Sequence, residues 1–302
     1  MSLLVVGSIA FDSIDTPHGS AERVLGGSAS YLSYASAFFT ETRLMGPVGD
    51  DFPQAAIDVF VNQGVDTAGI EKMPGKTFFW HGKYHENMDH RETLQVDQNV
   101  LGEYNPTVPE KFRDSEYIFL ANAQPSLQMH VLNQMPHKKL AFCDTMGLWI
   151  ETQRAGLVEL LAKVDGIVLN EDEARMLTDA ACTTLVAAGR RIQQMGPKHV
   201  VIKKGEHGAL LLTGEHVFAI PAYPLEHVFD PTGAGDTFGG GMMGHLARTG
   251  DLSFDNMKRA LLYGSITASF NVEDFSLERL KKVNLDDIES RCCEFVEMMR
   301  LD

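Results

Sequence analysis

The stretch Asp230-Pro-Thr-Gly-Ala-Gly-Asp-Thr-Phe-Gly-Gly-Gly241 joins a glycine-rich turn to the beginning of a predicted helix. Apolar residues at 217–220 precede it as a short predicted strand, and apolar residues within 242–247 follow it at helical spacing. The first backbone N–H groups of a helix have no partner within the helix and carry partial positive charge, so they bind anions, above all phosphate. The stretch therefore predicts a strand, a phosphate-binding turn and a helix in succession.

Asp236, in the first turn of this predicted helix, has two interpretations. Aspartate is a preferred capping residue, so a structural role at the beginning of the helix explains it without any chemistry. A carboxylate beside a phosphate site is otherwise electrostatically unfavourable, and its natural task is to accept the proton of a hydroxyl group that attacks phosphorus.

The longer pattern Asp-x-Thr-Gly-Ala-Gly-Asp-Thr-Phe, late in a chain of 302 residues, resembles the signature of the ribokinase-type (PfkB) carbohydrate and nucleoside kinases. The resemblance implies that Asp236 is the catalytic base and that the amides of Gly233, Ala234 and Gly235 form the anion hole. It also implies ATP and Mg²⁺ as cofactors and a sugar or a nucleoside as the acceptor.

Composition limits the class of protein. With 302 residues, 44% of them apolar and 22% charged, the chain can form one large α/β domain over 1–302. The 26 basic and 41 acidic residues give a formal charge of −15, which argues against nucleic acid or an anionic membrane as a partner. The four cysteines have no metal-type spacing, and neither a signal peptide nor an apolar run of about 20 residues is visible. We therefore expect a soluble, cytoplasmic protein.

The N-terminal part supplies the predicted acceptor site. Leu3–Val6 is a short apolar run typical of a buried parallel strand, and Asp12 follows at its carboxyl end, where ligands bind in open α/β sheets. On the residues alone, Asp12 fits a turn equally well, and Gly26 and Gly27 fit a tight loop before a helix. The resemblance implies that all three hold the acceptor, together with the residue at Tyr31. The family has asparagine where this chain has Tyr31, so the identity of the acceptor stays open.

Residues 76–100 differ from the rest of the chain because aromatic and polar residues alternate loosely and no helical period fits. They predict two or three strands with a hairpin around 87–90. The resemblance implies that they form a small β lid over the acceptor, to which about 13–24 add strands. The aromatic side chains at 78–80 either cover the acceptor or seal the lid, for example as the interface of a homodimer.

Asn170 ends a predicted strand at 165–169, and Glu173 follows it at the beginning of a predicted helix. Acidic residues there are explained by the helix dipole alone. The resemblance implies in addition that Asn170 and Glu173 organise the nucleotide phosphates and Mg²⁺, largely through water. The two roles are compatible.

Residues 200–213 predict two strands joined at Gly205 and Gly208. The resemblance implies that the nucleotide lies against this hairpin, because glycine lets ribose and phosphates approach the backbone. Lys203 or Lys204 then faces phosphate, where the family often has a hydroxyl residue. A solvent-exposed lysine at the edge of a strand is the alternative.

Asp230 precedes Asp236 by six residues. The resemblance implies a potassium ion bound in this loop, which would be a fixed positive charge beside the transferred phosphoryl group. The alternative is that Asp230 only caps the turn through nearby backbone amides, as aspartate often does.

Together these patterns predict a doubly wound α/β fold, with a mostly parallel, ribokinase-like central sheet and a small β-sheet lid. The predicted function is the ATP-dependent phosphorylation of a hydroxymethyl group of a sugar, and a nucleoside kinase of the same fold is the alternative. A sugar- or nucleoside-binding sensor without turnover would not need Asp236. A nicotinamide-type dinucleotide site is excluded, because its fingerprint would require glycine where Phe238 stands.

Overall fold

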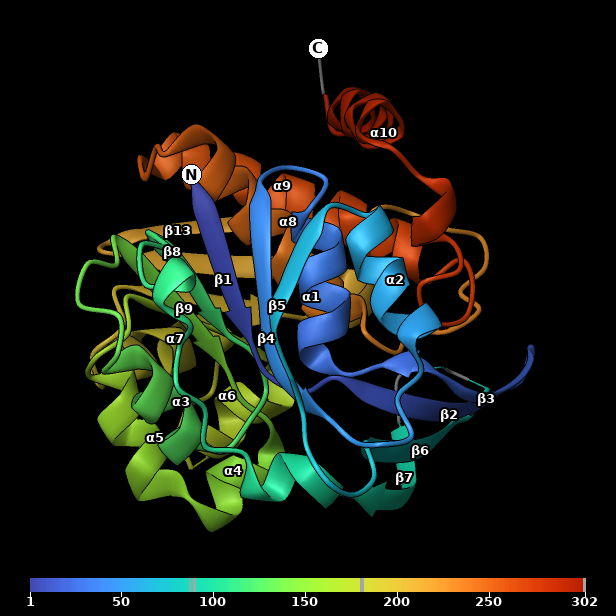
Figure 1. The fold of residues 1–302 in the computed structure, drawn as a ribbon. Helices are drawn as coiled ribbons and strands as arrows, with labels where there is room; N and C mark the ends of the chain where they lie inside the picture. The colour runs from blue at the N-terminus through green and yellow to red at the C-terminus, as the bar shows by residue number, and fades with distance from the viewer. Residues whose placement is uncertain (87, 89–90, 180–181, 301–302) are drawn as a thin grey trace.

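A nine-stranded sheet forms the centre of the protein in the computed structural model, which describes residues 1–86, 88, 91–179 and 182–300 (Figure 1). Its strand order is β13-β12-β11-β10-β9-β8-β1-β4-β5. The strands from β5 to β11 pair in parallel, whereas β12 and β13 are antiparallel. Their bounds are β1 Ser2–Val6, β4 Glu41–Val48, β5 Val65–Lys72, β8 Tyr117–Leu120, β9 Leu140–Asp144, β10 Gly166–Asn170, β11 His199–Lys203, β12 Ala209–Thr213 and β13 His216–Ile220.

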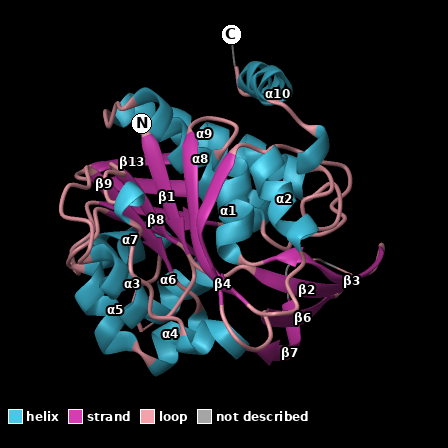
Figure 2. Cartoon of the chain, in the orientation of Figure 1, coloured by secondary structure: helices cyan, strands magenta, loops and turns pink. Residues whose placement is uncertain are grey.

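Helices cover both faces of this sheet (Figure 2). The central strands are short apolar runs because both of their faces are buried. In β1, for example, Leu3 and Val5 belong to one core, and Leu4 and Val6 belong to the other. The first core lies under α1 (Ser28–Ser36), α2 (Gln54–Asn62), α8 (Ala234–Thr249), α9 (Phe254–Asn271) and α10 (Leu285–Met298). The second lies under α3 (Pro125–Leu132), α4 (Gly147–Thr152), α5 (Arg154–Leu161), α6 (Glu171–Leu177) and α7 (Leu185–Gln193). This arrangement confirms the predicted doubly wound fold.

Short 3₁₀ helices occupy four of the described connections. They are η1 Asn99–Glu103, η2 Glu110–Phe112, η3 Gly205–His207 and η4 Leu280–Lys282. Of these, η3 forms the turn between β11 and β12, where the sequence predicts a hairpin.

A second sheet of four strands, in the order β3-β2-β6-β7, lies to one side of the central sheet (Figure 1). Its strands are β2 Ala10–Thr16, β3 Gly19–Gly26, β6 Phe78–Tyr84 and β7 Arg91–Asp97. The predicted small β sheet is therefore present, although its first two strands begin earlier and end later than the predicted 13–24. Asp12 consequently lies within β2, and its interpretation as a turn residue is wrong. Most of the hairpin predicted at 87–90 lies outside the described residues.

Glycines allow α8 to pack closely against α1. A Cβ atom at Gly240 would lie 2.4 Å from the carbonyl oxygen of Leu32 and 2.7 Å from the Cβ of Ala35. Non-bonded atoms do not approach so closely, and interiors this dense resist even one added methyl group. The run Gly239-Gly240-Gly241 therefore fixes the position of α8, and with it the position of Asp236 at the beginning of that helix.

We predict that Gly240→Ala lowers the free energy of unfolding by about 1–3 kcal/mol, because the added methyl group must displace the backbone of α1. Urea unfolding measures the change. Gly156→Ala is the matched control, since the nearest atom to its new Cβ, in Pro125, is 3.7 Å away and alanine favours a helix. Equal stability of the two variants would contradict the proposed close packing.

Candidate active site

The beginning of α8 is built on a left-handed glycine. Gly233 is the N-cap residue with φ of 75°, and Ala234 begins the helix. The Cα atom of Gly233 lies on the face of the Tyr31 ring, because an added Cβ would be 2.5 Å from three of the ring atoms. Only glycine both adopts this positive φ readily and leaves room for the Tyr31 ring. The predicted turn and helix are therefore present, with Asp236 in the first turn; the N–H group of Ala234 donates to the Pro231 carbonyl (3.2 Å).

A lysine ammonium group lies against this helix start. A Cβ at Gly235 would be 2.5 Å from Nζ of Lys203, which extends from the end of β11. Burial raises the pKa of Asp236, and the positive charge of Lys203 is the largest influence that lowers it. Of the two lysines considered from the sequence, Lys203 is thus the one that reaches the helix start, whereas the backbone N–H of Lys204 closes the hairpin on Gly208 (2.8 Å).

Asp144, at the end of β9, is a second carboxyl group beside Asp236. Burial and the negative charge of Asp236 raise the pKa of Asp144 well above its ordinary value, so Asp144 retains its proton and donates a hydrogen bond to the Asp236 carboxylate. The sequence analysis did not select Asp144. An acidic residue at the carboxyl end of a central parallel strand was the available signal.

On the other side of the helix start, the structure brings together the residues predicted to hold the acceptor. Asp12 is buried, and a Cβ at Gly26 would lie 2.0 Å from its Oδ2 atom. The N–H group of Gly27 donates to the Asp12 carboxylate. Burial, followed by the charge of Asp230, raises the pKa of Asp12 to about 8. Among the described residues, the buried hydroxyl of Tyr31 has no hydrogen-bond partner.

The small sheet contributes two residues that the sequence analysis missed. The hydroxyl of Thr232 donates to the hydroxyl of Tyr84 (3.1 Å), which joins β6 to the loop before α8. Arg91, the first residue of β7, lies 5.4 Å from the centre of the Trp80 ring. Burial raises the pKa values of Asp12 and Asp236, and the Arg91 charge partly offsets both shifts. Neither Tyr84 nor Arg91 lies in a recognisable sequence motif, so the sequence offered no signal for these two residues.

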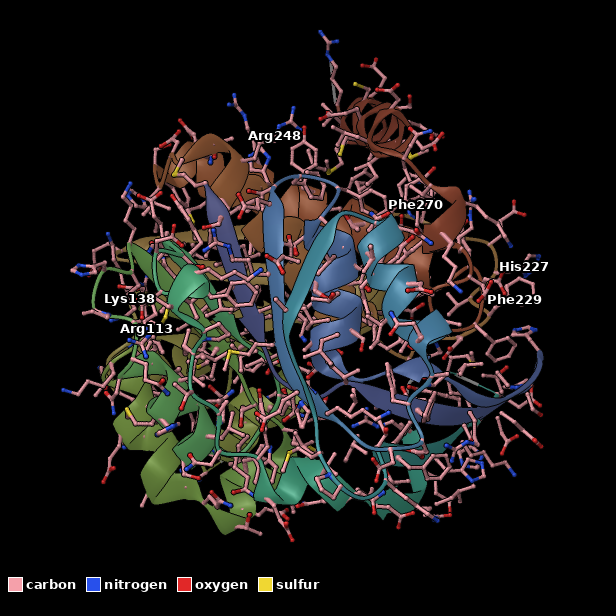
Figure 3. The ribbon with its side chains drawn as sticks, viewed as in Figure 1. Arg113, Lys138, His227, Phe229, Arg248 and Phe270 are labelled. Atoms are coloured by element: carbon pink, nitrogen blue, oxygen red, sulfur yellow. The ribbon has the colours of Figure 1, made fainter. Side chains whose placement is uncertain are left out.

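A further contact joins the small sheet to the loop before α8. The rings of His18, in the turn after β2, and Phe229 are 5.2 Å apart. Phe229 and His227 lie on that loop at the edge of the molecule (Figure 3). The small sheet is therefore joined to the loop before α8 at two points.

Asn170 and Glu173 form a reciprocal capping box at the beginning of α6. The Oδ1 atom of Asn170 accepts the N–H of Glu173 (2.8 Å), and Oε2 of Glu173 accepts the N–H of Asn170 (2.8 Å). The structural interpretation is thus correct. Burial raises the pKa of Glu173 and the Lys203 charge lowers it, so Glu173 also faces the helix start.

The acids and amides at this place suit magnesium bound to a nucleotide. The part of the chain that the structure describes contains no group of three or more His, Cys, Asp or Glu residues able to hold a metal ion by themselves. Magnesium normally retains several waters and binds one or two carboxylates together with substrate phosphates. Glu173 and the amide oxygen of Asn170 fit that kind of site.

Gly205 and Gly208 lie in the turn between β11 and β12, as expected. Both have positive φ, 53° and 84°. A Cβ at Gly208 would be 2.0 Å from the Ile220 carbonyl oxygen, whereas nothing lies within 4 Å of a Cβ at Gly205. Gly208 thus serves packing, and Gly205 leaves open space beside the backbone.

Asp230 is fully buried and caps its own loop. Its Oδ1 atom accepts the N–H of Thr232 (2.8 Å), and its Oδ2 atom accepts the N–H of Ser276 (3.4 Å). Burial raises the pKa of Asp230 to about 6. The turn-capping role is therefore observed, and a potassium site remains a prediction.

Comparison with known proteins explains this arrangement. The model of the pfkB family carbohydrate kinases matches residues 2–280. The chain belongs to this family. It is also 30% identical over 255 residues to the cytidine kinase of Thermococcus kodakarensis, an alignment that covers 82% of this chain and 89% of that protein. The predicted family and the predicted enzyme class, a kinase, are confirmed.

Solved structures of a nucleoside kinase and of a putative ribokinase share the fold at lower identity. The nucleoside kinase of Burkholderia thailandensis in complex with inosine superposes with a TM-score of 0.81 at 19% identity, covering 98% of this chain and 99% of that one. A putative ribokinase II from E. coli in complex with ATP and Mg²⁺ superposes with a TM-score of 0.79 at 20% identity, covering 97% and 99%. These similarities confirm the ribokinase-like fold.

The raised pKa of Asp12 leads to a stability prediction. The pKa of Asp12 is 3.8 in the unfolded chain and about 8 in the folded protein. Between these pH values the unfolded chain has released a proton that the folded protein retains, so the stability of the folded protein falls as pH rises through this range. Asn cannot ionise but can still accept the Gly27 N–H. We predict that Asp12→Asn raises Tm at pH 8 by at least about 2 °C, with a smaller gain at pH 6.

Thermal unfolding between pH 6 and pH 8.5 measures this gain. Asp286→Asn, at an exposed position in the first turn of α10, is the control and should show no such trend. If the difference in Tm between Asp12→Asn and the unmodified protein did not change with pH, Asp12 would already be ionised in the folded protein over this range.

Proposed function

We propose that this pfkB-family kinase transfers the γ-phosphoryl group of ATP to the hydroxymethyl group of a furanose, either as a nucleoside or as a free sugar. The observation that carries the proposal is the placement of Asp12 and Asp236, two carboxyl groups within electrostatic range of each other at the glycine-built beginning of α8. One can hold acceptor hydroxyls while the other faces the attacking hydroxyl. A nucleoside is favoured because the relative that aligns with 82% of the chain is a cytidine kinase.

Each residue of the site has a task in this reaction. Asp236 accepts the proton of the hydroxymethyl group, Asp12 with Gly26 and Gly27 orients the acceptor, and Tyr31 forms one wall. ATP, when bound with Mg²⁺, supplies the phosphoryl group: the new O–P bond forms as the bond to the β-phosphate oxygen breaks and ADP leaves with the electron pair. The amides of Gly233 and Gly235 stabilise developing negative charge, whereas the predicted Ala234 amide is used inside the turn by the Pro231 carbonyl; the small sheet excludes water.

The nucleotide side of the site is formed by the ends of β10 and β11. We propose that the nucleotide lies along the turn containing Gly205 and Gly208, because the open space beside Gly205 admits a ligand. Asn170 and Glu173, at the neighbouring strand end, then face its phosphates and Mg²⁺. The E. coli structure that contains ATP and Mg²⁺ supports this choice of cofactors.

An acceptor screen tests the proposal. ADP formation is measured with cytidine, other nucleosides, ribose, deoxyribose and fructose, each with ATP and Mg²⁺. We expect one hydroxymethyl furanose to give a rate far above the acceptor-free rate. A protein that releases no ADP above that background with any of them would refute the proposed function, and a pentose preferred over every nucleoside would decide for the free sugar.

Asp236 is the most direct mutational test. We predict that Asp236→Asn lowers kcat with the best acceptor by about 10²-fold or more, because the hydroxyl loses its proton acceptor, while the affinity for ATP is unchanged. Asp255→Asn is the matched control, because Asp255 lies in the first turn of α9 and stabilises the beginning of that helix without facing the site. Turnover close to that of the unmodified enzyme would reduce Asp236 to a capping residue.

Glu173 tests the proposed magnesium role separately from its structural role. Glutamine can keep the capping box, so Glu173→Gln should leave Tm nearly unchanged. We predict that it raises the Mg²⁺ concentration needed for half-maximal rate by about tenfold, since a charged ligand becomes neutral. Asp287→Asn, in the corresponding capping box of α10, serves as the control. An unchanged magnesium titration would leave Glu173 with its capping role alone.

Potassium activation depends on the loop around Asp230. We propose that the oxygens of this loop bind a potassium ion, and predict that the rate rises severalfold when potassium replaces sodium at constant ionic strength. Asp230→Asn should remove this difference. Equal rates of the unmodified enzyme in the two salts would leave Asp230 as a turn cap only.

Two further predictions concern the state of the protein. Leu94 and Val96 are exposed on the edge strand β7, in agreement with a homodimer through the lid, and the mass measured by light scattering decides between monomer and dimer. No helix within the described residues is long and apolar enough to cross a membrane. Fractionation of cells tests the predicted cytoplasmic location.

A further inference from the structure

Lys203 occupies an unusual position for a cation. Its Nζ atom lies against Gly235, at the helix end that carries partial positive charge, where an ammonium group is unfavourable unless anions surround it. The Lys203 charge acts on the carboxyl groups of Asp144, Glu173 and Asp236, although among the described residues no ion pair or hydrogen bond to Nζ is formed. A solvent-exposed lysine at the end of a strand would not need to place its ammonium group against Gly235.

The position also follows from the sheet. Lys203 ends β11 and pairs with Asn170 at the end of β10, and Asp144 ends β9, the next strand along. The ends of three neighbouring parallel strands thus place a cation and two polar groups opposite the beginning of α8. Ligands of open α/β sheets bind at this edge.

Asp144 has an unused capacity for interaction. It is only 5% exposed, and its Oδ1 atom has no hydrogen-bond partner among the described residues. The backbone of Asp144 is fixed, because Nε2 of Gln128 donates to its carbonyl oxygen (3.0 Å) and to that of Leu120 (2.9 Å). A buried, unpartnered oxygen on a fixed strand end is costly unless a function or a ligand requires it.

We propose that Lys203 is a further catalytic residue, whose ammonium group contacts the γ-phosphoryl group during transfer, and that Asp144 is a positioning residue that holds Lys203 and Asp236 in register. The proposal rests on the proposed function. Asp236 must lie beside the attacking hydroxyl, and the attacked phosphorus must lie next to that hydroxyl. A cation that lies against Gly235 therefore faces the γ-phosphate and not the α- or β-phosphates.

The charge balance of the site supports this assignment. An acidic site at the beginning of α8 would repel a triphosphate, and Lys203 supplies a positive charge within it. The ammonium group forms no ion pair with a carboxylate of the described residues, so it is available to the oxygens of the arriving phosphoryl group. Its charge then acts chiefly on the phosphoryl group, at the stage when Asp236 must accept a proton. Arg91 begins β7 of the small sheet and is exposed, so it does not lie between the strand ends as Lys203 does.

Nucleotide binding tests the position of Lys203 without turnover. Isothermal titration compares the non-hydrolysable triphosphate AMP-PNP with ADP, both with Mg²⁺, for Lys203→Met and for the neighbouring control Lys204→Met. We expect Lys203→Met to weaken AMP-PNP binding by about tenfold or more and ADP binding by less than about threefold, because one charge-assisted contact to the γ-phosphate is lost. Equal weakening of both nucleotides, or of neither, would overturn the assignment.

Turnover with the best acceptor gives the second measurement. Lys203→Met should lower kcat by about 10²–10³-fold, in the range of the loss of one donor to developing charge, with the acceptor KM nearly unchanged. If Lys203→Met does not fold, Lys203→Arg keeps the charge but displaces it, and its kcat should fall about tenfold at nearly normal Tm. A kcat of Lys203→Arg within twofold of the unmodified enzyme would overturn the catalytic role.

A double-mutant cycle tests Asp144. Asp144→Asn should lower kcat by about tenfold, and Asp144→Glu should restore part of this loss. Asp144→Asn combined with Lys203→Met should lower kcat by less than the product of the two single losses, because part of the effect of Asp144 acts through Lys203. Multiplicative losses would refute that role. A protein inactive in the acceptor screen would refute the proposed function, while the AMP-PNP comparison would still decide the position of Lys203.

Discussion

Several carboxyl groups lie around the beginning of one helix, and the balance of their charge is the constraint on which the rest of the site depends. On the acceptor side the charge of Asp230 raises the pKa of Asp12, and on the phosphate side Asp144 donates a hydrogen bond to Asp236. Burial makes each ionisation more costly. The helix dipole of α8 and the ammonium group of Lys203 are compensating positive charges on the phosphate side, where phosphate would bind, and Arg91 acts on both Asp12 and Asp236.

The packing of the backbone maintains this arrangement. α8 can approach α1 only because Gly240 has no side chain, and the helix can begin beneath Tyr31 only because Gly233 has none. A shift of α8 by the width of a methyl group would move Asp236 relative to Asp12. Catalytic groups lose much of their effect when displaced by about 1 Å. The glycines of the central stretch therefore serve geometry as well as anion binding.

Much of the fold could be predicted from the sequence, because its signals are local. Apolar runs such as Leu3–Val6 mark buried strands, and the turn at 230–235 marks a helix start. The residues inside motifs, including Asp236 and Asn170, could be predicted for the same reason, because a motif is a local signal. Arg91 and Asp144 could not be assigned in this way. Arg91 lies in a polar stretch of the sequence, and Asp144 ends a strand without a motif, so only the folded structure shows what they face.

The connection between the two sheets has a consequence for how substrates bind. The small sheet carries Asp12 and Arg91, and the hydroxyls of Tyr84 and Thr232 join it to the loop before α8. One element thus carries groups that act on both Asp12 and Asp236. A substrate that displaced this sheet on binding would change the affinity for the other substrate, and linkage makes the factor the same in both directions. Titrations of each substrate, alone and in the presence of the other, would give that coupling free energy.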